Sequence, residues 1–73
     1  MKTWEVIKYL IENPDFNVVF VSIQNGIKYD IYLDDYTKEI FIDELKNTDK
    51  GWIHKTQFSN FEVNRLLQID NWS

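Results

Sequence analysis

An Asn-Gly pair between two apolar runs most constrains the fold of this chain. The β-branched run Val18–Ile23 stands before the pair, and Ile27–Leu33 alternates apolar and polar residues after it. Asn-Gly is typical of a two-residue type I′ hairpin loop, because both loop positions require positive φ. We therefore predict a β-hairpin with Asn25-Gly26 as its loop.

A two-residue loop determines which residues of the hairpin share a face. We predict that the core face carries the pairs Gln24–Ile27, Ser22–Tyr29, Phe20–Ile31 and Val18–Leu33. The opposite face then carries Val19, Val21, Ile23 and Tyr32 beside Lys28 and Asp30. This second face is too apolar to stand in water, and a chain of 73 residues has little else to cover it. We predict that the protein is a homo-oligomer that associates through this face.

The first residues predict a helix over residues 4–12. Thr3 is a favourable N-cap, and the apolar residues recur at helical spacing: Trp4, Ile7, Leu10 and Ile11. Asn13-Pro14 ends the helix, because the residue before proline is disfavoured in the α region.

Beyond the hairpin, residues 39–43 predict a third strand, 46–51 a loop and 52–55 a possible fourth strand. Ser59 and Glu62 match a capping box, which predicts a short second helix over about residues 60–68. The fold class is α+β. We predict a single domain, residues 1–73, with a small antiparallel sheet of three or four strands, an N-terminal helix on its core face and a short C-terminal helix.

Composition excludes several kinds of chemistry. There is no cysteine and one histidine, so we expect no disulfide, no metal site and no cofactor. Adjacent acids such as Asp34 and Asp35 point apart in a strand or turn, and His54 is the only imidazole base, so we expect no enzymatic activity. No segment approaches the roughly 18 apolar residues of a membrane span, and no signal peptide is recognisable. We expect a cytoplasmic protein with no membrane partner.

The negative charge is concentrated in the middle of the chain. Residues 30–49 hold seven acidic residues against two lysines, within a net charge of −4. This argues against direct binding of duplex nucleic acid, which depends on basic side chains. Asp34, Asp35 and Glu39 would suit an interface with a basic protein, and a purely solvating role is the alternative.

The aromatic residues suggest a second kind of site. Trp4, Phe20, Tyr29 and Phe61 occupy periodic apolar positions and are expected in the core, whereas Tyr32, Phe41, Trp52 and Trp72 are harder to bury together. Aromatics that the core does not need often stack on a planar ligand or mark an interface. The candidate ligand-binding residues are Trp52, His54, Lys55, Arg65 and Trp72.

The two ends of the chain resemble known kinds of protein. Met1–Leu10 with Asn13-Pro14 resembles the start of small phage and prophage accessory proteins of Gram-positive bacteria. Gly51-Trp52-Ile53 and the closing Leu66–Trp72 resemble the C-terminal pattern of phage Thoeris anti-defence sponges, which are oligomers that sequester cyclic nucleotide immune signals. Where that family has a basic element after the first helix, this chain has Asn17–Phe20.

Three functional hypotheses follow. The resemblance implies a phage-type counter-defence protein in the cytoplasm of a bacterial host, acting as an oligomeric sponge for a small nucleotide ligand. The acidic segment instead favours a protein-binding inhibitor of a host nuclease or repair enzyme. A structural or interaction module without a defence role is the third.

Overall fold

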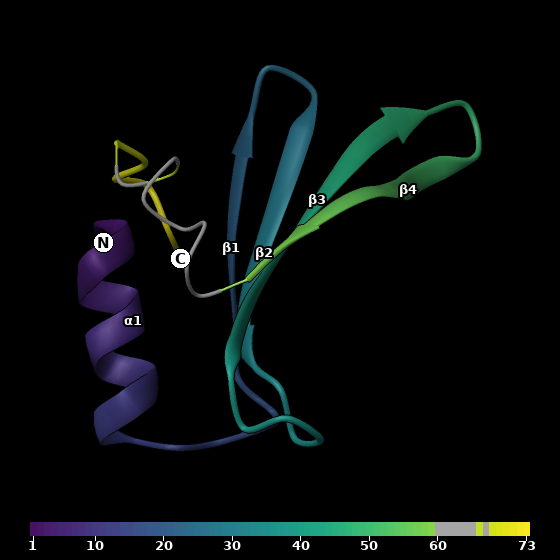
Figure 1. Cartoon of the computed structure of the whole chain (residues 1–73). Coiled ribbons are helices and arrows are strands. Elements are labelled where there is room, and N and C mark those ends of the chain that lie inside the picture. Colours follow the sequence, from purple (N-terminus) through teal and green to yellow (C-terminus); the bar gives the residue numbers. More distant parts are fainter. Residues whose placement is uncertain (60–65, 67) are drawn as a thin grey trace.

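The computed structural model, which describes residues 1–59, 66 and 68–73, has one helix beside one sheet (Figure 1). The elements are α1 (Thr3–Glu12), β1 (Val19–Gln24), β2 (Ile27–Leu33), β3 (Ile40–Thr48) and β4 (Gly51–Phe58). The strands form an antiparallel sheet in the order β1-β2-β3-β4. This confirms the predicted α+β class, with four strands. The predicted second helix falls largely on residues 60–65 and 67, which lie outside the described ranges.

The predicted hairpin is confirmed in loop and in register. Asn25 and Gly26 have φ of 50° and 77°, the positive values that a type I′ loop requires. Ser22 pairs with Tyr29 and Phe20 with Ile31, as the loop length predicts. The core face is also the predicted one, because Ser22 and Ile31 are buried.

The buried side of α1 differs from the prediction. Thr3, Val6 and Leu10 are the buried residues of the helix, at spacings of three and four. Trp4, predicted in the core, is exposed, and so is Ile11. The prediction was right for Leu10, and Ile7 packs against the core, but it placed Trp4 and Ile11 on the buried side and omitted Val6.

Thr3 is also not the N-cap that the sequence suggested. It is the first residue of α1, and its buried hydroxyl donates to the carbonyl of Leu66 at 2.6 Å. The same oxygen accepts a hydrogen bond from the indole Nε1 of Trp72 at 2.8 Å. The hydroxyl therefore ties the start of the helix to the end of the chain.

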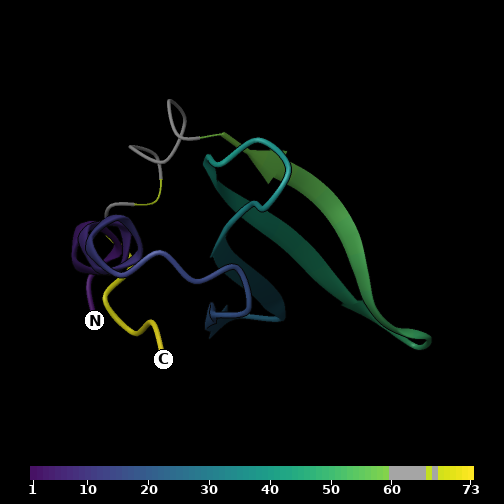
Figure 2. The same cartoon turned by 90° about the horizontal axis from the view of Figure 1, so that it is seen from below.

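The last residues of the chain complete the core. Figures 1 and 2 show that the two termini lie side by side, next to the start of α1. The backbone N–H of Trp72 donates to the carbonyl of Met1 at 3.2 Å, and Ser73 and Val21 exchange two backbone hydrogen bonds at the free edge of β1. The last residue therefore shields a sheet edge that would otherwise present unpaired backbone groups.

Trp72 is consequently a core residue. Only 2% of its surface is exposed, and it belongs to a cluster of buried residues from the helix, the sheet and the C-terminal segment: Val6, Leu10, Ile31, Leu33, Ile40, Ile42, Leu66 and Ile69. The sequence placed it among the candidate ligand-binding residues. In the structure it has almost no surface to offer a ligand.

The third and fourth strands are longer than predicted. The polar residues 46–48, expected to form a loop, continue β3, and β4 runs from Gly51 to Phe58. Their backbone groups pair across the two strands, and this pairing outweighs the weak β propensity of the side chains. The β3–β4 hairpin projects away from the rest of the sheet (Figure 1). No helix among the described residues is long and apolar enough to cross a membrane.

Candidate functional site

The outer face of the sheet, opposite α1, is the first candidate site. Directly paired residues of an antiparallel sheet share a face, so the register assigns residues from every strand to it. They are Val19, Val21 and Ile23 of β1, Lys28, Asp30 and Tyr32 of β2, Phe41, Asp43 and Leu45 of β3, and Trp52, His54 and Gln57 of β4. The structure thus places the predicted interface residues Val19, Val21, Ile23 and Tyr32 together.

Apolar side chains on this face remain exposed to solvent. Val19 is 49% exposed, Ile23 54% and Trp52 37%. They lie on the two outermost strands of the sheet. Helix α1 packs against the other face, so it leaves this one uncovered (Figure 2).

A polar strip of hydrogen-bonded side chains crosses the middle of the outer face. The side-chain amide of Gln57 donates to the Tyr32 hydroxyl and to Asp43 Oδ1, both at 3.0 Å. His54 Nε2 lies 3.4 Å from the same Asp43 oxygen. Lys28 Nζ lies 3.6 Å from Asp30 Oδ1. The strip holds side chains of three strands in fixed positions between the exposed apolar residues.

Two carboxylates in this strip stand directly opposite each other. Asp30 and Asp43 are register partners on β2 and β3, an arrangement in which like charges repel. Asp30 Oδ1 is buried and accepts no hydrogen bond, since Lys28 is within ion-pair range but too far for one. Lys28 is therefore the cation that offsets the charge of Asp30 beside Asp43.

The pKa of the Tyr32 hydroxyl is shifted by its position in this strip. Burial raises its pKa to about 12, and its hydrogen bond to the negatively charged Asp43 adds to the rise. The neutral phenol is therefore the form that the folded protein favours.

We expect a spectroscopic titration of tyrosinate to show a group with a pKa of about 12, and Tyr32→Phe to remove it. Because this pKa lies above the unfolded value, the associated stability is complete below about pH 10 and is lost as the pH rises towards 12. Asp43→Asn should move the pKa part of the way back, because burial remains. A titration unchanged by Tyr32→Phe would contradict the assignment.

The acidic turn between β2 and β3 is less free than its sequence suggested. Asp34 Oδ2 accepts hydrogen bonds from the backbone N–H and hydroxyl of Thr37, which lower the Asp34 pKa. Asp35 pairs with Lys38 at 2.9 Å. Within the described part of the chain, Glu39 is the one of the three predicted acids whose side chain has no such partner. The Asp34 carboxylate therefore stabilises the turn, whereas Asp30 and Asp43 are the acidic residues on the outer face of the sheet.

The structure does not bring the five candidate ligand-binding residues together. Trp52 and His54 share the outer face, whereas Lys55 pairs with Glu44 at 3.4 Å on the opposite face. Trp72 is in the core, and Arg65 lies outside the described residues. An aromatic-cation site made of these residues is not assembled.

Sequence reasoning missed Asp43, Leu45 and Gln57 as members of the outer face. The alternation of β2 already put Asp30 there, but Asp43 joins it only through the pairing of β2 with β3. The described residues include no group of His, Cys, Asp or Glu that could hold a metal ion. Comparison with protein-family models, curated proteins and solved structures found no match for this chain.

Proposed function

We propose that this chain is a small binding protein that docks a protein partner on the outer face of its sheet and acts by binding rather than by catalysis. The observation that carries the proposal is the composition of this uncovered face. Exposed apolar side chains flank an ordered polar strip, and specific protein interfaces combine these two kinds of surface.

The partner that fits this face presents a basic side chain. An arginine or lysine near Asp30 and Asp43 would relieve the repulsion between these two facing carboxylates. The net charge of −4 would also favour the approach of a basic protein. A basic partner agrees with the inhibitor hypothesis, now supported by Asp30 and Asp43 more than by the acidic turn.

The resemblance at the ends of the chain suggests the biological setting. We propose a phage-type counter-defence protein whose partner is a host protein with a basic surface. The nucleotide-sponge hypothesis is not the one we favour, because its candidate residues are divided between two faces and the core.

Affinity selection from a bacterial extract, with matched variants, tests the docking face. We expect the wild-type protein to retain a partner. Two variants should fail to bind this partner: Ile23→Asp, and the double variant Asp30→Asn with Asp43→Asn. Ile11→Asp, on the exposed side of α1, and Asp35→Asn with Glu39→Gln, between β2 and β3, are controls with the same changes of charge and should retain it. Binding should weaken as salt rises. A partner that still binds the Ile23→Asp variant would refute this face as the site.

Sedimentation of the purified protein at micromolar concentration tests the predicted self-association separately. Because each copy carries Lys28 as well as Asp30, a second copy is the other protein that suits the face. A dimer that Ile23→Asp dissociates and Ile11→Asp preserves would assign the face to a second copy and would overturn the basic host partner. A monomer agrees with the proposal.

A further inference from the structure

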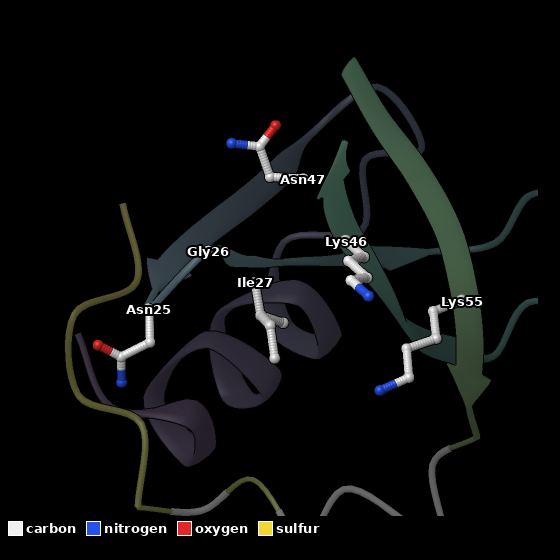
Figure 3. Close-up of a pocket in the computed structure, with 6 residues that line it drawn as sticks. All are labelled: Asn25, Gly26, Ile27, Lys46, Asn47 and Lys55. Atoms are coloured by element: carbon white, nitrogen blue, oxygen red, sulfur yellow. The ribbon is translucent and has the colours of Figure 1, made fainter. Parts of the chain in front are cut away.

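A cleft lies on the other side of the sheet, between the β1–β2 loop and the projecting β3–β4 hairpin. Its volume is about 520 Å³, within the range of small-molecule sites. It is lined by Asn25, Gly26, Ile27, Lys46, Asn47 and Lys55 (Figure 3). Ile27 and Lys46 are register partners on the face opposite the polar strip, so this cleft is separate from the proposed docking face.

We propose that this cleft binds the phosphate group of a small molecule. Lys46 and Lys55 come from different strands, and Figure 3 shows both ammonium groups directed to the same side of the cleft. Lys46 forms no salt bridge with any acid in the described ranges. Lys55 pairs with Glu44, so the three side chains together carry one net positive charge in an otherwise acidic chain.

Lys55 lies at a register shift of β4 beside the cleft. Glu44 pairs with Thr56 and Leu45 with His54, which leaves Lys55 as the extra residue of β4. Bulges re-aim side chains and are common beside functional sites. Alternation along β4 puts Lys55 on the face opposite His54, which is the face of Lys46, and the register shift leaves it beside Thr56 across from Glu44.

The Glu44 carboxylate is already compensated within the protein. The Glu44 side chain is mostly buried and pairs with Lys55 at 3.4 Å. The pKa of Tyr29 is raised by the burial of Tyr29 and by its hydrogen bond to Glu44. Tyr29 therefore remains a neutral donor to Glu44. This second donor allows Lys55 to share its charge with an incoming anion.

The remaining lining suits the rest of a phosphate ester. Asn25 stands at the other end of the lining from the lysines, and Asn47 points away from them (Figure 3). The Asn47 backbone N–H donates to the Gly26 carbonyl at 3.2 Å, which connects the two hairpins at the cleft. Ile27 lies between Asn25 and Lys46 and offers an apolar contact for a carbon group attached to the phosphate.

Titration of the isotope-labelled protein with inorganic phosphate, followed by NMR, tests the site. We expect saturable shifts of the Gly26 and Asn47 amide signals. The dissociation constant for phosphate should rise by a factor of about ten or more in Lys46→Gln and in Lys55→Gln, since each substitution removes one charged hydrogen bond. Lys50→Gln, in the β3–β4 turn, changes the net charge equally and should bind as wild type. In the spectrum of each variant, unchanged signals from residues away from the cleft show that the fold is intact.

Two results would overturn the proposal. One is a set of shifts that chloride reproduces at equal ionic strength, and the other is equal weakening by Lys50→Gln. Phenyl phosphate tests the apolar wall: it should bind more tightly than inorganic phosphate, and Ile27→Ala should remove that difference. None of these outcomes depends on whether the outer face docks a protein.

Discussion

Replacement of Trp72 by alanine is expected to bring the free energy of unfolding close to zero, so that a large fraction of molecules is unfolded at room temperature. The side chain is 2% exposed, packs in the core and donates to the Thr3 hydroxyl at 2.8 Å. Loss of a buried tryptophan costs about 3–5 kcal/mol, and a core of this size supplies roughly 3–5 kcal/mol in total. Far-ultraviolet circular dichroism and a denaturant titration measure the loss.

Trp52→Ala is the matched control for this prediction. Trp52 lies on the outer face and is 37% exposed, so its removal should cost less than about 1 kcal/mol. Trp72→Phe keeps an aromatic ring but loses the hydrogen bond to Thr3. Its loss of free energy of unfolding should lie between those of Trp72→Ala and Trp52→Ala. Equal denaturation midpoints for Trp72→Ala and wild type would show that the C-terminal segment does not complete the core.

Leu10→Ala is expected to destabilise the protein by about 2–5 kcal/mol, whereas Ile11→Ala should change the free energy of unfolding by no more than about 0.5 kcal/mol. The two residues are neighbours on α1, but Leu10 is 0% exposed and Ile11 is 62% exposed. Chemical denaturation of both variants measures the difference. Similar losses would mean that the helix presents the side that its sequence suggested.

The candidate site could be predicted in part from local patterns. Alternation along β1 and β2 was enough to place Val21, Ile23 and Asp30 on one face. The opposition of Asp30 and Asp43 depends on how β2 pairs with β3, and no turn signal in the sequence specifies that register. For the same reason, the sequence could not show that Lys55 is the unpaired residue at a register shift of β4.

The sequence by itself determined the elements whose causes are local. Asn25-Gly26 specifies the loop, the register of the first hairpin follows from it, and Asn13-Pro14 ends α1. The tertiary structure alone decided which side of α1 is buried and where Trp72 lies. The physical reason is distance along the chain. Trp72 and Thr3 are 69 positions apart, so no local sequence pattern in either segment predicts their hydrogen bond. The apolar pattern of α1 fits Leu10 with either Val6 or Trp4 and Ile11, and only the tertiary contacts select Val6.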